Sequence, residues 1–185
     1  MATAAPSSPT TAPAAPAAAG SARGWGFTVL GVVRILLGFY FLWAFLDKLF
    51  GLGFSTPAER AWINGGSPTA GFLGGSIEGG NPFAGFWQFW LSLNPITNIL
   101  FMAGLLGIGI ALLLGIGMRI AAVSGAALYG LMYLAAFPMT TNPIIDDHVI
   151  LGVLMVALAG LGAGEYLGLG KQWKALVGRK APYLI

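Results

Sequence analysis

Four long apolar stretches constrain the fold of this chain more than any other feature of its sequence. They cover residues 27–46, 96–118, 120–139 and 149–169. A helix needs about 20 apolar residues to cross the roughly 30 Å hydrocarbon core of a bilayer, and each stretch approaches or exceeds that length. Charged residues make up only 8% of the chain, whereas soluble domains carry about 25%. The sequence therefore predicts an all-α membrane protein, a bundle of four transmembrane helices.

The distribution of Lys and Arg predicts how this bundle sits in the membrane. With four crossings, the N-terminus, the short turn between the second and third spans and the C-terminal tail share one side. That side holds most of the basic residues, namely Arg23, Arg119, Lys171, Lys174, Arg179 and Lys180. Because Lys and Arg are enriched in cytoplasmic loops, we expect both termini in the cytoplasm. We interpret the net charge of +3 as a mark of topology, with no nucleic-acid partner.

The chain outside the spans divides into two tails and one long loop. Residues 1–24 are almost entirely Ala, Pro, Ser, Thr and Gly, so they can bury little apolar surface and we expect a disordered cytoplasmic tail. A signal peptide is the competing interpretation, but the small residues precede the apolar stretch instead of following it. Residues 25–170 form the expected membrane domain, and 171–185 a basic cytoplasmic tail.

The segment 47–94 is predicted to be a long extracytoplasmic loop that contains short helices. The motif at 56–59 has the form of a capping box with proline at the first helical position, which predicts a helix that ends near Asn64. Two related hexamers, 67–72 and 81–86, each begin with a capping residue and a proline. They predict two further short helices, the second of which continues into aromatic residues suited to the membrane interface.

Small residues recur at every fourth position in three of the predicted spans. The stripes are Gly107-Ala111-Gly115, Ala122-Ala126-Gly130 and Gly160-Gly164-Gly168. Such stripes let helix backbones approach closely in lipid, so we expect them at helix contacts. The alternative is that glycine is simply common in membrane helices.

Arg34 is the strongest single signal, because it lies about seven residues, or about 10 Å, inside the first span. A charge at this depth is costly unless it is paired or faces a cavity. Arg34 shares one face of the helix with Phe45 and Lys48, so that face should point into the bundle. Two interpretations remain open: Arg34 holds a ligand, or it is a structural group that reaches the inner interface or pairs with Glu165.

A second group of ionisable side chains is expected at the outer membrane face. Asp147 and His148 stand where the fourth span begins, and a histidine beside a carboxylate can exchange a proton near neutral pH. Asp47 and Lys48 end the first span on the same side. Each group alone fits a helix cap or an interfacial helix end, but their joint placement predicts a functional site between the first and fourth spans.

The residue types exclude several kinds of redox centre. The chain has no cysteine and one histidine, so it can form neither a cysteine-ligated iron–sulfur cluster nor a bis-histidine haem. The scattered carboxylates do not predict a metal site, and no nucleotide-binding or hydrolase motif is present. Any redox chemistry must use a bound cofactor without thiolate ligands.

Four segments carry a resemblance to a known family. They are Arg34–Gly38, Leu46–Gly51, Ala61–Thr69 and Asn142–His148. In these segments the chain resembles the DoxX/DoxD group of small four-helix bacterial membrane proteins. The resemblance implies a four-helix bundle in the bacterial cytoplasmic membrane. DoxD-type members are described as a membrane subunit of thiosulfate:quinone oxidoreductase, so a quinone is the implied cofactor.

We therefore expect the membrane subunit of a quinone-linked oxidoreductase that oxidises thiosulfate or a related sulfur anion. The expected roles are proton transfer by His148 with Asp147, an anion or the reduced quinone held by Lys48 or Arg34, ring stacking by Trp43, Phe45 or Trp62, and a roof formed by the loop with Trp62 and Asn64. Expected partners are membrane lipid, a small anionic substrate, and a second redox subunit or another copy of the chain. The alternatives are a non-catalytic scaffold or lipid-binding module and, with less support, a small-solute transporter.

Overall fold

The computed structural model describes residues 18–140, 142, 144–178 and 180–181, with the backbone alone for residues 18–23. In this part of the chain there are seven α-helices, three short 3-10 helices and no strand. The prediction of an all-α protein is confirmed.

Three helices are long and apolar enough to cross a membrane. The four helices of the bundle are α1 (Ala18–Phe50), α4 (Ile96–Leu114), α5 (Met118–Ala135) and α6 (Asp147–Gly160). Of these, α1, α4 and α5 qualify as spans. Helix α6 is apolar but has only 14 residues, which gives a length of about 21 Å. Within the described residues the chain thus has the helices of a membrane protein, and three of them are long enough to span.

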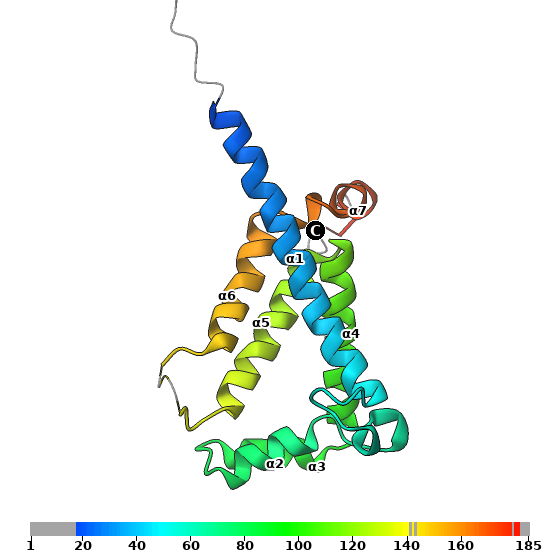
Figure 1. The fold of residues 1–185 in the computed structure, drawn as a ribbon, viewed down its shortest axis with the longest axis vertical. Coiled ribbons are helices and arrows are strands. Elements are labelled where there is room, and N and C mark those ends of the chain that lie inside the picture. The colour runs from blue at the N-terminus through cyan, green and yellow to red at the C-terminus, as the bar shows by residue number, and fades with distance from the viewer. Residues whose placement is uncertain (1–17, 141, 143, 179, 182–185) are drawn as a thin grey trace, which may run out of the picture.

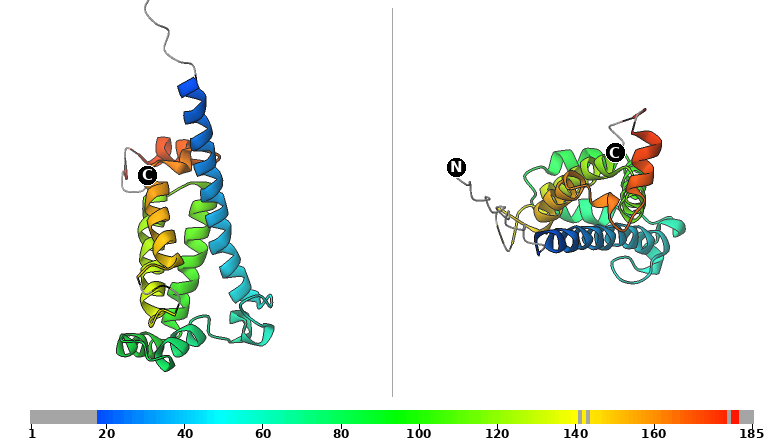
Figure 2. Two further views of the ribbon diagram at one scale, coloured as in Figure 1. Left: turned by 60° about the vertical axis from the view of Figure 1, so that its left-hand side comes forward. Right: turned by 90° about the horizontal axis from the view of Figure 1, so that it is seen from above.

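The bundle consists of two helix pairs, α1 with α4 and α5 with α6, joined by contacts between α4 and α5 (Figures 1 and 2). A tight turn connects α4 to α5, and it requires glycine because Gly115 and Gly117 have φ of 72° and 57°. In Figure 1 the α5/α6 pair leans away from the α1/α4 pair toward the end that carries α2 and α3. The buried core is apolar and includes Leu37, Phe41, Met102, Leu105, Leu112, Met155 and Leu158.

The apolar stretch 149–169 does not form one continuous helix as expected. Helix α6 ends at Gly160, and Gly162 has a left-handed backbone with φ of 66°. The chain then forms the 3-10 helix η3 (Ala163–Glu165) and the short helix α7 (Gly170–Val177). Hydropathy cannot detect this break, because glycine and leucine residues keep the segment apolar while the glycines let the backbone turn.

The tails also differ from the expected boundaries. Helix α1 begins at Ala18, so part of the segment 1–24, for which we expected disorder, is helical, while residues 1–17 lie outside the described residues. In Figure 1 the N-terminal part of α1 projects beyond the other helices. In the expected tail 171–185, α7 occupies residues up to Val177, and residues 179 and 182–185 lie outside the described part.

Two short helices lie across one end of the bundle, opposite α7 (Figures 1 and 2). They are α2 (Ala70–Glu78) and α3 (Ala84–Ser92), and we call them the platform. Both short helices expected from the repeated hexamers are therefore present. The single helix expected from the capping box is instead two 3-10 turns, η1 (Ala58–Arg60) and η2 (Trp62–Asn64).

Buried amide side chains attach the platform to the bundle. Asn98 on α4 accepts a hydrogen bond from the Thr69 hydroxyl at 2.7 Å, just before α2. Between α2 and α3, the Asn81 side chain donates to the carbonyls of Leu134 at 2.8 Å and Ala135 at 3.2 Å, at the C-terminal end of α5. These bonds fix the platform relative to both helix pairs.

The predicted stripes coincide only in part with the close contacts. Gly115 and Gly164, which belong to two of the stripes, lie against each other: a Cβ added to Gly115 would be 2.6 Å from the Gly164 carbonyl oxygen. A Cβ added to Gly38 would lie 2.8 Å from the Leu113 nitrogen, so α1 and α4 touch at this point. A Cβ on Gly107 would meet no atom within 4 Å, and the same holds for Gly130 and Gly160. The prediction was wrong for these three positions, because a four-residue repeat does not reveal which face of a helix is covered.

Candidate functional site

A cavity of about 820 Å³ lies between the two helix pairs and beneath the platform. All four bundle helices contribute to its wall, and the wall is predominantly apolar. The aromatic side chains that line it are Tyr40, Phe41, Trp43, Phe54, Phe72, Trp87, Trp90, Phe101 and Tyr129. The volume is in the range of about 300–1,000 Å³ that is typical of small-molecule sites.

Ionisable groups line this cavity from two different helices. Asp147 and His148 line it from α6, and Lys48 lines it from α1. The sequence predicted these residues together at one membrane face, and the structure brings them to the wall of a single cavity. The arrangement combines an apolar interior with polar groups at two edges.

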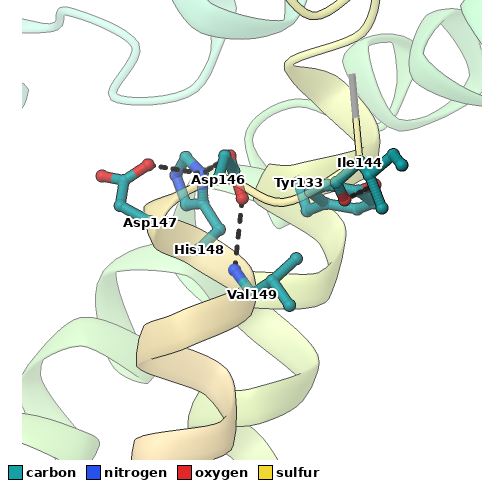
Figure 3. Close-up of polar contacts among 6 residues, drawn as sticks. All are labelled: Tyr133, Ile144, Asp146, Asp147, His148 and Val149. Carbon is teal, nitrogen blue, oxygen red and sulfur yellow. Dashed lines mark hydrogen bonds and ion pairs between the residues drawn. The ribbon is translucent and has the colours of Figure 1, made fainter. Parts of the chain in front are cut away.

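His148 forms a close pair with Asp146 at the start of α6 (Figure 3). Asp146 is the N-cap of this helix: one carboxylate oxygen accepts the Val149 N–H at 3.2 Å. Its other oxygen lies 2.6 Å from Nδ1 of His148. Asp147, the partner that the sequence suggested, is 3.5 Å from the same nitrogen and its side chain is 74% exposed. The nearer carboxylate is therefore Asp146, which the cap geometry holds in place.

The electrostatics of this pair suit proton exchange. Burial by itself would raise the pKa of Asp146. The hydrogen bonds from His148 and from the Val149 N–H outweigh this effect, so the pKa of Asp146 lies below its ordinary value. An ionised carboxylate can only accept hydrogen bonds, so Nδ1 of His148 carries a proton. The other ring nitrogen, Nε2, is then the atom that can release and take up a proton.

Lys48 forms no salt bridge within 4.0 Å in the described part of the chain, although the neighbouring Asp47 carboxylate interacts with it electrostatically. Its Nζ lies 3.5 Å from the Ser55 hydroxyl. The adjacent Asp47 instead accepts the N–H groups of Phe54 at 3.2 Å and Ser55 at 3.1 Å, and thereby fixes the turn after α1. The positive charge of Lys48 is therefore available to an anion at the edge of the cavity.

Arg34 does not belong to this cavity. Its side chain is fully buried at the α7 end of the bundle, where the guanidinium donates to four backbone carbonyls. These belong to Leu112, Leu113, Tyr166 and Leu167. Carbonyls at the end of a helix carry partial negative charge, which accounts for the position of the cation at the end of α4.

The expected pair of Arg34 with Glu165 is not formed. Glu165 instead binds Lys174 of α7, with 3.2 Å between Nζ and the carboxylate. The end of helix α6 at Gly160 explains the difference, because the backbone that follows turns its carbonyls toward Arg34. Of the two roles left open by the sequence, the structure supports the structural one.

The aromatic residues and the roof expected from the sequence are only partly at the site. Trp43 lines the cavity, and its ring meets Phe54 edge to face at 5.1 Å. Phe45 and Trp62 pack against the core instead, and Asn64 is exposed and donates to the Ala58 carbonyl at 2.8 Å. The platform forms the roof instead, because η2 packs against α1.

Two side chains at the cavity were not predicted from the sequence. Tyr129 on α5 and Trp87 on α3 are each 3% exposed and line the cavity. Within the described part of the chain, neither the Tyr129 hydroxyl nor the Trp87 indole N–H has a hydrogen-bond partner. A tyrosine inside a predicted span was a visible signal for the first, but Trp87 stands among several aromatic residues that sequence alone does not distinguish.

The α6 start also brings together three groups that could coordinate a metal. One ligand atom each from Asp146, Asp147 and His148 lie within 4.8 Å of one another. The capping bond and the Asp146–His148 contact account for the partly buried Asp146 carboxylate without an ion, so this cluster by itself assigns no metal.

The fold and the cavity define a class of protein: an all-helical membrane protein with an aromatic-walled cavity at one end of its bundle. No known protein narrows this class, because the chain matches no family model, no curated protein and no solved structure.

Proposed function

We propose that this protein is the membrane subunit of a quinone-linked oxidoreductase that takes electrons from thiosulfate or a related sulfur anion. One observation carries the proposal: an aromatic-walled cavity is lined both by His148, held by Asp146, and by the cation Lys48. A quinone needs an apolar, aromatic pocket and a proton donor, and an anion needs a cation. The resemblance to DoxX/DoxD proteins in the segments around Lys48 and His148 supports the same function.

The proposed reaction balances without thiol or metal chemistry. Two thiosulfate ions form a sulfur–sulfur bond to give tetrathionate and release two electrons. The quinone accepts these two electrons and two protons to become a quinol. His148 donates one proton from Nε2 to a quinone oxygen and is reprotonated by water on the side where Asp147 is exposed. Water supplies the second proton of the quinol. Lys48 attracts the anion to the edge of the cavity.

The proposed setting is the bacterial cytoplasmic membrane, crossed four times. Helix α6 together with the segment 161–169 makes the fourth crossing. The platform faces outward and α7 lies in the cytoplasm, because the basic residues Arg119, Lys171 and Lys174 belong to the α7 end. Single cysteines at the exposed positions Glu78 and Lys171 test this topology. A membrane-impermeant reagent applied to intact cells should label the first only, and labelling of both would reject it.

The function is tested by quinone reduction in membranes from cells that produce the protein and in the protein purified in mild detergent. We expect quinone in an organic extract of the purified protein, and thiosulfate-dependent quinone reduction in the membranes. Lys48→Gln should raise the KM for thiosulfate and make it less sensitive to ionic strength, because a partly exposed cation acts through screened attraction. Lys171→Gln, at the other end of the bundle, is the matched control. A folded protein with neither quinone nor turnover would favour the non-catalytic scaffold.

A further inference from the structure

The most unusual feature of the cavity wall is a pair of buried donors without acceptors. Within the described residues, the buried side-chain nitrogens and oxygens that lack a partner are Arg34 Nε, Trp87 Nε1 and the Tyr129 hydroxyl. Arg34 is satisfied through its other nitrogens, whereas Trp87 and Tyr129 have no other polar atom. Folded proteins rarely leave such groups unpaired, because desolvation without a hydrogen bond is costly. Both residues line the same cavity.

We infer that Tyr129 and Trp87 hold the two oxygens of an aromatic dicarbonyl in this cavity, an assignment that rests on the proposed function and adds the residues that recognise the quinone. An indole N–H can only donate a hydrogen bond, so Trp87 requires an acceptor atom on the ligand. The phenol of Tyr129 supplies the second donor. Neither donor atom has accessible surface in this structure, so a flat ring with two acceptor atoms pairs with both donors once the Trp87 and Tyr129 side chains turn toward the cavity that they line.

The surroundings of the two donors favour a neutral ligand over the sulfur anion. Trp87 packs with Leu73 and Ala135 in an apolar cluster beneath the platform. Tyr129 packs against Phe41, with 5.2 Å between the ring centroids. Transfer of an anion into such surroundings without a paired cation is strongly unfavourable, whereas a carbonyl oxygen accepts a hydrogen bond there at little cost.

The arrangement also orients the ligand. The Tyr129 ring lies 6.1 Å from the His148 ring, measured between centroids. The oxygen bound by Tyr129 is therefore the one beside the proton donor. Trp87 extends from the platform and holds the other oxygen, so the two carbonyls of the ring are not equivalent.

The test compares two ligands that differ only in their oxygens. Menadione has two carbonyl oxygens on a methylnaphthalene ring system, and 2-methylnaphthalene has none. Their binding to the full chain in lipid nanodiscs is measured for the wild type, Tyr129→Phe and Trp87→Phe. Each variant should bind menadione about fivefold more weakly, as expected for one lost hydrogen bond of about 1 kcal/mol. Binding of 2-methylnaphthalene should change less than twofold.

Matched controls come from the same cavity wall. Tyr40→Phe and Trp90→Phe remove the same chemical groups from residues that also line the cavity. The polar atoms of Tyr40 and Trp90 are not among the buried atoms that lack a partner. Both should retain the wild-type preference for menadione. An unchanged menadione affinity in Tyr129→Phe and Trp87→Phe, or an equal loss for both ligands, would overturn the inference.

A second measurement needs no substitution and therefore does not depend on how a variant folds. Indole ¹⁵N–¹H resonances of the wild type are recorded with each ligand, and the Trp87 resonance should shift downfield with menadione only. Failure of this inference is distinct from failure of the proposed function. Selective menadione binding without thiosulfate-dependent turnover would retain the dicarbonyl site and reject the oxidoreductase. Thiosulfate-dependent turnover without selective menadione binding would retain the oxidoreductase and reject the dicarbonyl site.

Discussion

Helix α1 places a basic side chain at each end of the bundle, and the two side chains differ in how many hydrogen-bond partners the protein gives them. At the α7 end, Arg34 is fully buried and donates to four backbone carbonyls. At the platform end, Lys48 is half-buried, meets one hydroxyl at 3.5 Å and lines a cavity of about 820 Å³. The first cation completes the protein's own hydrogen bonds, and the second leaves its charge available to an anion.

The packing differs in the same sense. At the α7 end the backbones touch: a Cβ on Gly115 would lie 2.6 Å from the Gly164 carbonyl oxygen. At the platform end, large aromatic side chains separate the helix pairs and line a space that they do not fill. The comparison teaches that burial of a charge in a membrane helix does not by itself identify a functional residue. What distinguishes the two ends is whether the hydrogen-bonding groups already have partners.

The largest effect is expected where the bonds are already made. Arg34→Gln should strand several buried carbonyls and lower the free energy of unfolding by about 3 kcal/mol or more. Arg34→Lys should recover only part of this, since an ammonium cannot reach both sets of carbonyls as the guanidinium fork does. Unfolding in a denaturing detergent titration measures the effect. A stable Arg34→Gln protein would break the distinction between the two ends.

His148→Gln should show the opposite pattern, with a large loss of activity and little loss of stability. Removal of a general acid lowers turnover by about a hundredfold or more, while the Asp146 cap on α6 remains in place. The assay is quinone reduction at saturating thiosulfate, with protein abundance in membranes as the control for folding. Wild-type turnover in the folded variant would exclude proton transfer by His148.

The glycine contacts allow a sharper test of where the bundle is closed. Gly38→Ala should destabilise the protein by about 1–3 kcal/mol, because its Cβ would overlap the α4 backbone. Gly107→Ala faces open space and should be neutral or stabilise α4 by less than about 1 kcal/mol. The same detergent titration compares the two variants. Equal losses would show that α1 and α4 do not meet at Gly38.

The smallest effect is expected for Glu165→Gln. Its partner Lys174 is 57% exposed in the side chain, and exposed ion pairs contribute less than about 1 kcal/mol. No hydrogen bond or ion pair joins Arg34 to Glu165, so Arg34→Gln and Glu165→Gln should act additively in the double variant. If Arg34→Gln instead recovered part of the stability lost in Glu165→Gln, the result would support the Arg34–Glu165 ion pair that the sequence suggested.

Much of the architecture followed from local properties of the chain. Apolar stretches long enough to cross a bilayer predicted α1, α4 and α5, and proline after a capping residue predicted the short helices of the platform. The sequence also predicted that Lys48 and His148 lie at the membrane surface, because each stands at the end of an apolar stretch, where a span meets water. These features depend on sequence neighbours alone, so no tertiary information was needed.

The rest depended on contacts between distant segments. Only the tertiary structure shows that Asp146, and not Asp147, lies closest to His148, because the N-cap conformation turns one carboxylate inward and leaves the other exposed. It also brings Tyr129 and Trp87, more than 40 residues apart along the chain, to the wall of one cavity.

Arg34 illustrates the division most clearly. The sequence determined that a charge this deep in an apolar helix must be satisfied from within the protein, because lipid offers no hydrogen bonds. Which atoms satisfy it was decided by the break after α6, which turns the carbonyls of Tyr166 and Leu167 toward the guanidinium. Backbone carbonyls are present at every residue, so no sequence pattern marks the ones that a fold will present to a buried charge.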